Sequence, residues 1–320
     1  MSVYDMKKGR LPMNRYAQRI ARDYPVRRKA QEKENIRAYL IGQLRALGYD
    51  AQLDDCGRAV NIIAGDPERA RIFYAAHYDT GLHELLPPII CPTRPATYAL
   101  YQALTPLLAL LGSFALSVGV TFALNLPNMT LPLFIVLLLG ALVYLRFGPA
   151  EQNNLNDNTS GIAALLETAE ALTPRYRGDV CFLFLDGGSG SMQGAKGFRA
   201  KYPSAKEKPV ICLDSVGSGD ELLILPSKGA RWNGELLDAI NASFENTERK
   251  TCYDKVDGLV YYPSDNRAFK QGVAVCAVRH VKGFGRIACP TGKDNIMDDE
   301  NLNLLRDGLV RLAAAYQIKK

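Results

Sequence analysis

The sequence predicts an α/β protein whose mostly parallel, mixed central sheet is sandwiched by helices and carries an inserted hydrophobic helical hairpin. Three observations predict this fold. Short apolar runs of strand length alternate with segments of helical periodicity. Polar residues that are able to bind a metal follow several of these runs. Residues 100–145 contain no charged side chain. A chain of 320 residues is long enough for one enzyme-sized domain with such an addition.

The predicted elements follow one another through the chain. Strands are expected at 60–64, 71–76, 180–185, 210–213, 222–225 and 273–278. Helices are expected at 30–47, 162–172, 234–244, 266–271 and 302–316. In the first helix Ile36, Leu40 and Leu44 recur at helical spacing, and Gly48 ends it. In sheets of this kind ligands gather at the carboxyl ends of the strands.

The predicted domain organisation has three parts. Residues 1–29 form a basic, loosely held arm, residues 30–97 and 148–320 form the α/β domain, and residues 98–147 form the hairpin. The densest basic cluster is Arg27-Arg28-Lys29, which fits a solvated helix face or a contact with anionic lipid. A nucleic-acid partner is not expected, because the net charge of +6 is spread widely and no groove-reading motif accompanies it.

The uncharged stretch predicts two membrane-spanning helices. Residues 100–126 are long enough to cross a bilayer, and residues 129–147 are at the low end of the required length. Asn125, Pro127 and Asn128 form the turn, and Pro106 and Pro132 are expected near helix starts. The alternatives are two buried helices or an apolar lid over a pocket.

The flanks of the hairpin predict its orientation. Arg94 and Arg146 lie on the same side of it, which the positive-inside tendency makes cytoplasmic. The amino terminus has no apolar stretch of a secretory signal, and the seven cysteines include no CxxC pair. We therefore expect a membrane protein whose main domain lies on the cytoplasmic side, in a reducing compartment.

Two short polar strings contain the candidate metal ligands. His77-Tyr78-Asp79-Thr80 follows an apolar run, so the His is at the end of a predicted strand with a carboxylate two residues on that is able to orient its ring. Asn156-Asp157-Asn158-Thr159-Ser160-Gly161 forms a polar turn before a helix. Either string alone is more often a capped turn, but the two together and in this order are more specific.

In this order the strings resemble those of the co-catalytic zinc aminopeptidase superfamily, which also holds glutamate carboxypeptidases and glutaminyl cyclases. Five further segments resemble the family in the same order: 61–64, 182–187, 213–217, 264–266 and 291–294. The resemblance covers about residues 30–90 and 150–318. It implies a zinc exopeptidase-like fold around the predicted sheet.

The resemblance also implies a set of ligands. Enzymes of this family generally hold two zinc ions bridged by one aspartate, with a glutamate as general base on water. His77 matches the first histidine ligand, with Asp79 as its orienting partner. Asp157 matches the bridging aspartate, and Asp214 matches a later aspartate ligand. These three residues would complete the protein ligands of one zinc ion.

The other half of the family's site is missing from this sequence. Gly188 occupies the position of the general base, Ser189 that of a glutamate ligand, and Pro290 that of the last histidine. We therefore expect at most one zinc ion. Cys289 or His83 could substitute as a ligand and Asp186 as a base, although a packed cysteine, a surface histidine and a structural aspartate are the commoner interpretations.

Two functions follow from this mixture of retained and missing residues. The first is a membrane-anchored pseudo-peptidase that binds a peptide or protein in its cleft. The second is an active metallo-exopeptidase with an altered or single-metal site. A purely structural anchor with an empty cleft is a third possibility, which the joint retention of His77, Asp79, Asp157 and Asp214 disfavours. Restoring Glu at 188 and 189 and His at 290 is expected to raise the zinc content towards two. The sequence predicts no particular oligomeric state.

Overall fold

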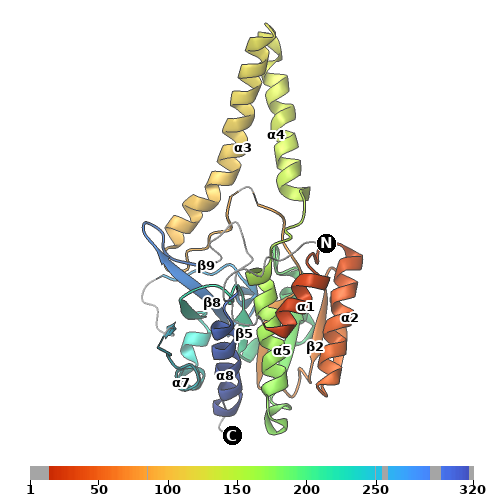
Figure 1. The fold of residues 1–320 in the computed structure, drawn as a ribbon, viewed down its shortest axis with the longest axis vertical. Coiled ribbons are helices and arrows are strands. Elements are labelled where there is room, and N and C mark those ends of the chain that lie inside the picture. The colour runs from red at the N-terminus through yellow and green to blue at the C-terminus, as the bar shows by residue number, and fades with distance from the viewer. Residues whose placement is uncertain (1–13, 85, 249, 254–258, 289–296, 317–320) are drawn as a thin grey trace, which may run out of the picture.

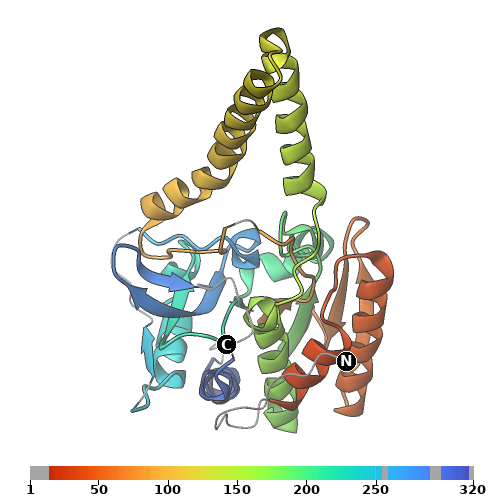
Figure 2. The same ribbon diagram turned by 45° about the horizontal axis from the view of Figure 1, so that its top comes forward.

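The computed structural model describes residues 14–84, 86–248, 250–253, 259–288 and 297–316 (Figure 1). In these ranges the chain forms one mixed sheet with helices on both faces, and a long helical hairpin rises from one end of the domain (Figure 2). The strands are β1 (Ala51–Asp55), β2 (Val60–Ala64), β3 (Ile72–His77), β4 (Val180–Leu185), β5 (Val210–Leu213), β6 (Glu221–Pro226), β7 (Thr251–Tyr253), β8 (Gly272–Val281) and β9 (Gly285–Ala288).

The order of the strands in the sheet is β1-β2-β4-β3-β5-β8-β6-β7, and β9 pairs with β8. The four central strands, β4, β3, β5 and β8, run parallel. The pairs β1–β2, β2–β4, β6–β8 and β8–β9 are antiparallel, whereas β6 and β7 are parallel. The predicted α/β fold with a mixed sheet is confirmed, and its parallel part is the centre, where the strands that precede the candidate ligands lie side by side.

Helices cover both faces of the sheet. One face is covered by α1 (Arg15–Asp23), α2 (Ala30–Ala46), α5 (Gly161–Ala171), α7 (Gly234–Ser243) and α8 (Asp299–Ala315). The other face packs against α6 (Gln193–Lys201) and the short turns η4 (Pro203–Glu207) and η6 (Asp265–Ala268). The central strands are buried on both faces, which explains why their sequences are continuous apolar runs rather than alternating ones.

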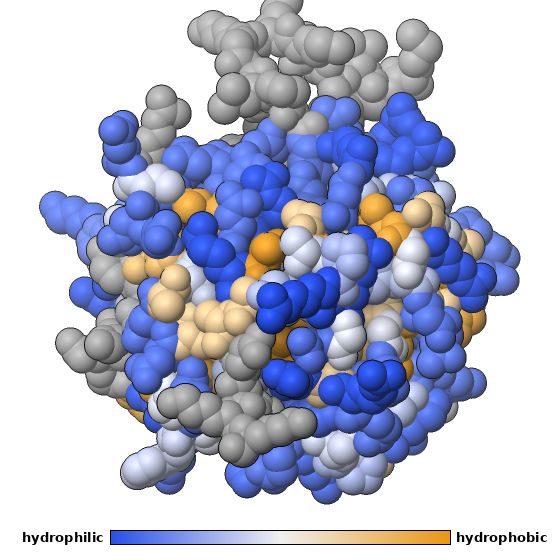
Figure 3. Space-filling view, turned by 90° about the horizontal axis from the view of Figure 1, so that it is seen from below, coloured by the Kyte–Doolittle hydropathy of each residue, from blue (hydrophilic) through white to orange (hydrophobic). Residues whose placement is uncertain are grey.

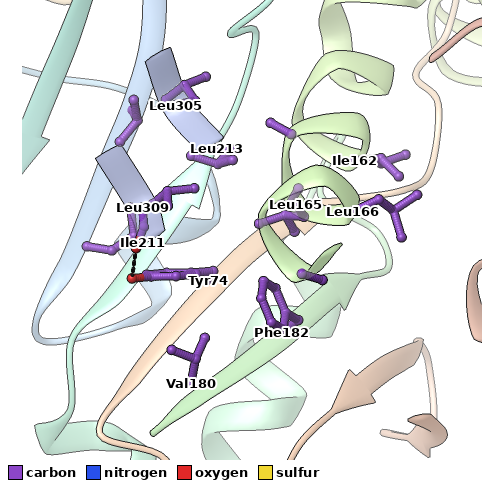
Figure 4. Close-up of a cluster of buried hydrophobic side chains, with 14 of the residues drawn as sticks. Tyr74, Ile162, Leu165, Leu166, Val180, Phe182, Ile211, Leu213, Leu305 and Leu309 are labelled. Atoms are coloured by element: carbon purple, nitrogen blue, oxygen red, sulfur yellow. Dashed lines mark hydrogen bonds between the residues drawn. The ribbon is translucent and has the colours of Figure 1, made fainter. Parts of the chain in front are cut away.

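The largest core cluster lies under α5 and α8 (Figure 4). Tyr74 of β3 packs edge-to-face on Phe182 of β4, with ring centroids 5.9 Å apart. Its hydroxyl donates to the carbonyl oxygen of Leu309 in α8 at 2.7 Å, so the buried phenol has a partner. Leu165 and Leu166 of α5 are completely buried beside these rings. This cluster holds β3 in place, and His77 is the last residue of β3.

The amino-terminal segment corrects the expectation of a loosely held arm for residues 14–29. Tyr16, Ala17 and Ile20 of α1 are buried in the main core. Arg27, expected on a solvated face, is completely buried. Its guanidinium donates to the carbonyl oxygens of Tyr78 at 2.6 Å and Tyr24 at 2.9 Å. The apolar spacing in α1 is the signal that the basic composition obscured.

The hairpin consists of α3 (Pro95–Ala123), the turn η1 (Pro127–Met129) and α4 (Thr130–Phe147). Both helices are long and apolar enough to cross a membrane. No residue in the apolar window of α4 is buried and only 11% are in that of α3, so the alternative of two buried helices does not hold. Nor do they form a lid, because they project away from the domain (Figures 1 and 2). Pro106 lies inside α3 rather than near its start, because the helix begins earlier than expected.

Other differences from the expected elements are small in extent. The strands β1, β7 and β9 and the helix α6 were not expected, because their sequences are polar or short. The helix predicted for 266–271 is only the single turn η6. The remaining strands begin and end within a few residues of the predicted positions.

Candidate metal centre

Three side chains meet at the carboxyl-end edge of the central strands. His77 ends β3, Asp214 directly follows β5, and Asp157 lies in the short helical turn η2 (Leu155–Ser160) that precedes α5. One ligand atom from each residue lies within 4.8 Å of the other two. Among the described residues this is the one group of three or more His, Cys, Asp and Glu side chains with such geometry. The structure thus brings together the three residues that the sequence predicted as ligands.

His77 is buried and is held between two carboxylates. Its Nε2 lies 3.2 Å from Oδ1 of Asp157, and its Nδ1 lies 3.4 Å from Oδ1 and 3.2 Å from the main-chain oxygen of Asp79. Burial opposes the imidazolium, but the hydrogen bonds and charges of Asp157 and Asp79 outweigh it and raise the pKa of His77. Without a metal the two carboxylates thus favour the protonated ring, and Asp79 lies where a partner that orients a ligand histidine is found.

Asp157 is placed by the polar residues around it. It has a non-helical backbone conformation inside η2, and the Asp157–Asn158 peptide bond is cis. The Asn158 amide donates to the carbonyl oxygen of Leu213 at 2.9 Å, which joins η2 to the end of β5. The amide oxygen of Asn156 accepts from the main-chain N–H groups of Gly217 and Ser218 at 2.7 and 3.0 Å. The two asparagines thus fix the turn of Asp157 against the segment of Asp214.

Asp214 is buried at the end of β5. The hydroxyl of Ser215 donates to its Oδ1 at 3.0 Å, and the hydroxyl of Tyr262 donates to its main-chain oxygen at 3.2 Å. Burial first and the charge of Asp157 second raise the pKa of Asp214, whereas His77 lowers it. The charge of Asp157 disfavours that of Asp214, so these two carboxylates and one imidazole form a donor set that a divalent cation would stabilise.

The donor set fits a zinc ion. Zinc takes imidazole nitrogen and carboxylate oxygen at about 2.0–2.2 Å in tetrahedral geometry, so two donors of one ion lie about 3.3–3.6 Å apart. The His77–Asp157 pair is already at 3.2 Å, and the remaining separations, within 4.8 Å, would contract around a bound ion. The side chain of Asp157 is 40% exposed while that of His77 is 5% exposed, so the centre opens on the side of Asp157.

The segment at the positions of the missing base and glutamate is bound to Asp79 instead. Gly187 follows β4 with a φ of +71°, a conformation that favours glycine. The N–H groups of Gly188 and Ser189 donate to the carboxylate of Asp79 at 2.8 and 3.2 Å, and the Ser189 hydroxyl donates to it at 2.7 Å. The carboxylate that orients His77 therefore also fixes this segment.

Position 188 has no room for a side chain. A Cβ atom there would overlap the Cβ of His77, and would lie 2.5 Å from its Cγ and 2.8 Å from Oδ2 of Asp265. Separations under about 3 Å between such atoms do not occur without displacement of one of them. Glu at 188 would therefore require His77 or Asp265 to move, and the expected rise in zinc content on restoring residues 188, 189 and 290 together stays a prediction.

The substitutes that the sequence left open differ in outcome. His83 is exposed and its Nδ1 lies 2.7 Å from the carboxylate of Glu151, outside the three-residue group. Asp186 is buried and forms an ion pair with Lys33, while its carboxylate also accepts from the N–H of Val60 at 3.2 Å. These contacts favour the structural interpretation of Asp186. Cys289 and Pro290 lie outside the described residues.

Asp265 is a candidate that sequence reasoning did not single out. It is 2% exposed in η6, and its Oδ2 faces the space beside Gly188. Its Oδ1 has no hydrogen-bond partner. Burial is the main cause that raises the pKa of Asp265 to about 7, and the charges of Asp79 and Asp214 add to it while His77 opposes it. The Ser-Asp-Asn string of 264–266, which resembles a pocket-side segment, was the available signal.

A cavity of about 230 Å³ is lined by residues that also reach the centre. Tyr262 contacts Asp214, and Asn266 follows Asp265. Tyr261, Phe269 and Leu225 supply apolar surface, and Arg267 supplies a charge. Asn266 is 6% exposed, and its amide oxygen is buried without a hydrogen-bond partner.

Comparisons with known proteins agree with this fold. Residues 145–300 match the model of Peptidase family M28. The structure is similar to a glutaminyl cyclase from Porphyromonas gingivalis, with 14% identity over 93% of this chain and 94% of that chain and a TM-score of 0.56. A Zn-dependent exopeptidase from Parabacteroides distasonis has 16% identity over 94% of this chain and 96% of its own, with a TM-score of 0.56.

A third similar structure is the LapA aminopeptidase of Legionella pneumophila, with 10% identity over 95% of this chain and 71% of that one and a TM-score of 0.57. No curated protein sequence matches the chain. At these identities each likeness to a solved structure shows the fold alone. Together with the family match, the structures confirm the resemblance to the co-catalytic zinc exopeptidases that the sequence motifs indicated.

Proposed function

We propose that this chain, which has the fold of the co-catalytic zinc exopeptidases, is a membrane-anchored pseudo-peptidase that holds at most one zinc ion and binds a peptide or protein segment in its cleft. One observation carries the proposal: three ligands converge in a well-supported group, while the position of the general base is filled by the packing of His77 and Asp265 against Gly188. The two halves of the site differ in what they retain.

His77, Asp157 and Asp214 would hold the zinc ion. A bound zinc ion supplies a Lewis acid that polarises a carbonyl group. The protein's own contribution is positional: Asp79 orients the imidazole, and Asn158 and Ser215 hold the two aspartate segments. This arrangement supports binding of a carbonyl or carboxylate group of a peptide at the open side of Asp157.

The retained residues provide no general base for proton transfer at position 188, where the family has a glutamate. A positioned base contributes about 10²–10⁴-fold to such reactions. Gly188 and Ser189 carry no carboxylate, and their N–H groups are engaged with Asp79. Peptide hydrolysis is therefore expected to be slow even with the zinc ion in place.

An active metallo-exopeptidase with an altered site is the second candidate, and Asp265 is the observation that favours it. This carboxyl group faces the space at position 188 and is buried with one oxygen unpartnered. Because burial raises its pKa to about 7, it is able both to accept and to donate a proton near neutral pH. In this alternative Asp265 replaces the missing glutamate as general base.

The hairpin supports the membrane part of the proposal. Two apolar helices with almost no buried residues project from the domain. Insertion into lipid would remove their apolar side chains from water without any protein partner, and the helices close their own backbone hydrogen bonds. Arg94 and Arg146 at the two stems favour a cytoplasmic main domain. Extraction of membranes at alkaline pH tests insertion, because release of the intact protein would contradict a spanning hairpin.

Metal content and turnover of the full-length protein separate the two candidates. We expect about one zinc ion or less per chain and no measurable hydrolysis of aminoacyl substrates. Turnover that is lost in both Asp157→Asn and Asp265→Asn would overturn the pseudo-peptidase in favour of the altered enzyme. Zinc binding that survives Asp157→Asn would contradict the ligand set itself.

A further inference from the structure

Both stems of the hairpin are attached at the rim of the candidate metal centre. Residues 81–83 and 149–151, here called the neck, form a short two-stranded ladder: the N–H of His83 donates to the oxygen of Pro149 at 2.9 Å, and the N–H of Glu151 donates to the oxygen of Gly81 at 3.1 Å. Asp79 lies two residues before the neck and Asp157 six residues after it. The hairpin therefore rises from the same edge of the domain at which the centre lies.

The first turns of α3 are docked on the domain. The ring of Tyr98 lies 5.8 Å from that of Tyr261, and the ring of Tyr101 lies 6.0 Å from that of Phe284 in the turn between β8 and β9. Arg94 donates to the main-chain oxygen of Gly283 in the same turn at 2.9 Å. With the neck holding one stem and these contacts the other, the direction of the hairpin relative to the domain is fixed.

The lengths of the helices place the domain close to the bilayer. The 18 residues of α4 extend about 27 Å at 1.5 Å per residue, close to the roughly 30 Å of a hydrocarbon core. No linker separates α4 from the neck, because only Gly148 lies between them. If α4 spans the hydrocarbon, then the neck, the docked turns of α3 and the β8–β9 turn lie at the level of the lipid headgroups.

The composition of this face fits the headgroup region. Tyr98, Tyr101 and Phe284 supply the aromatic rings that are typical of membrane interfaces. Exposed basic side chains surround the same base: Arg94, Arg146, Arg267 and Lys282. Among the residues that the structure describes, Glu84 and Glu151 are acidic side chains at this base, and Glu151 is paired with His83. The end of the domain opposite the hairpin is predominantly hydrophilic (Figure 3).

The open side of the metal centre is turned towards the neck. Asp157 is the exposed ligand, and Glu84, which directly follows the neck residue His83, lies close enough for its charge to interact with that of Asp157. His77 and Asp214 lie behind it and are buried. A ligand that reaches the centre therefore approaches from the side on which the hairpin rises.

We infer that the face of the domain around the base of the hairpin lies against an anionic lipid surface, so that the His77–Asp157–Asp214 group opens towards the lipid headgroups. The ligand class follows: the centre takes a peptide segment presented at the membrane surface, such as the exposed end of a membrane-tethered chain. This inference rests on the proposed membrane anchoring, and it adds the orientation of the site and the kind of ligand.

The single tryptophan of the chain supplies an internal control for this orientation. Trp232 is 84% exposed and follows β6 in the sequence. β6 ends beside the first residues of β8, whereas His77 lies at the carboxyl ends of the parallel strands. Trp232 therefore lies at the opposite end of the strands from His77. The test uses the full chain reconstituted in vesicles of phosphatidylcholine and phosphatidylserine in equal amounts. Emission is measured with the native tryptophan, and with Phe284→Trp in a Trp232→Phe background.

We expect the tryptophan at position 284 to lose emission to lipids with a quencher just below the headgroups and to be protected from aqueous iodide. Trp232 should show the reverse. Tyr101→Trp in the same background gives a second probe if the first variant fails to fold. Iodide quenching at both probe positions equal to that of Trp232 would overturn the orientation. Protection from both quenchers would also overturn it, because the face would then be covered by protein.

Flotation with the vesicles separates this inference from the proposal on which it rests. Protein that fails to float contradicts the membrane anchoring itself. Protein that floats while position 284 remains in water leaves the anchoring intact and contradicts only the orientation. For the ligand, a peptide with an acyl anchor in the same vesicles should bind with higher apparent affinity than the same peptide without the anchor, and equal affinities would contradict the ligand class.

Discussion

The two halves of the candidate site differ in how the protein supports them. In the retained half every ligand is backed by neighbours: Asp79 holds His77, Asn158 fixes the turn of Asp157, and Ser215 donates to Asp214. In the other half the backbone at Gly188 lies so close to His77 and Asp265 that no side chain fits. The missing base thus does not leave a vacant position at 188, because His77 and Asp265 occupy the space that its side chain would need.

This difference teaches that the closed half now serves the retained half. The N–H groups of Gly188 and Ser189 stabilise the carboxylate of Asp79, which in turn holds the ring of His77. Burial opposes the charge of Asp79, but its hydrogen bond and charge interaction with His77 and its bond from Ser189 lower its pKa below the ordinary value. A segment that provides catalysis in the family's usual motif provides support here.

The largest effect is expected from Asp157→Asn. This change removes the candidate ligand that contacts His77 and lies on the open side of the centre. An amide is a poor zinc ligand, so zinc binding should fall below detection, while the free energy of unfolding of the metal-free protein should change by less than about 1 kcal/mol. Metal analysis and thermal unfolding check both. Asp220→Asn, at an exposed position, is the control. Retention of zinc by the Asp157→Asn variant would mean that the two halves do not differ as described.

The second largest effect is expected from Gly188→Ala. The methyl group would displace His77 or Asp265, which should cost about 1–3 kcal/mol of stability. Because His77 moves, zinc affinity should also fall by about 10–100-fold. Gly190→Ala is the matched control, since a Cβ atom there meets no atom within 4 Å. Equal zinc affinity in the two variants would contradict the closed state of position 188, and the same test applies to Gly188→Glu.

The sequence predicted the secondary-structure elements correctly where burial determines the pattern of apolar residues. The strands β4 and β5 are continuous apolar runs because both of their faces are covered, and β2 is apolar except for the buried Asn61; the predicted limits of all three coincide with the observed ones. The pattern failed for α1, whose buried residues are only three among basic neighbours. It also failed for α6, a short helix with few apolar residues. In both segments the polar and basic residues obscured the helical spacing of the few apolar ones, so no helix was predicted.

The sequence was less informative about the site than about the fold. The motifs identified His77, Asp157 and Asp214, and the structure brings them together. They could not show that Gly188 is required by packing, because the clash involves His77 and Asp265, which are distant in sequence. For the same reason the burial of Asp265 was not foreseen. These properties arise from tertiary contacts that no local pattern records.

A smaller effect is expected from Arg27→Met, which tests how the retained half is held together. Arg27 donates to the oxygen of Tyr78 and to the hydroxyl of Thr159, one residue in each ligand string. Loss of the guanidinium leaves these buried acceptors without a donor, which should cost about 2–4 kcal/mol of stability. Zinc affinity should fall about tenfold through misalignment of the strings.

Arg28→Met is the matched control for this change, because Arg28 is adjacent in sequence but only partly buried. Unfolding in denaturant and calorimetric titration with zinc measure the two effects. A variant at position 27 with the stability loss but with unchanged zinc affinity would show that Arg27 supports the fold and does not align the ligands.

The smallest effect on affinity is expected from Asp79→Asn, because two consequences oppose each other. In the metal-free protein the raised pKa of His77 favours its protonated ring, so zinc competes with a proton and its apparent affinity rises with pH until that pKa is passed. The Asp79→Asn substitution would remove one of the charges that raise this pKa and so weaken the competition from the proton. It would also remove the carboxylate that orients the ring and fixes Gly188 and Ser189.

We expect a net change of less than about tenfold in zinc affinity at neutral pH for Asp79→Asn. The proton release is the more sensitive measurement: calorimetry in buffers of different ionisation enthalpy should show protons released on zinc binding to the native protein and fewer in the variant. Unchanged proton release would show that Asp157 alone sets the protonation of His77, and that Asp79 does not connect the two halves of the site.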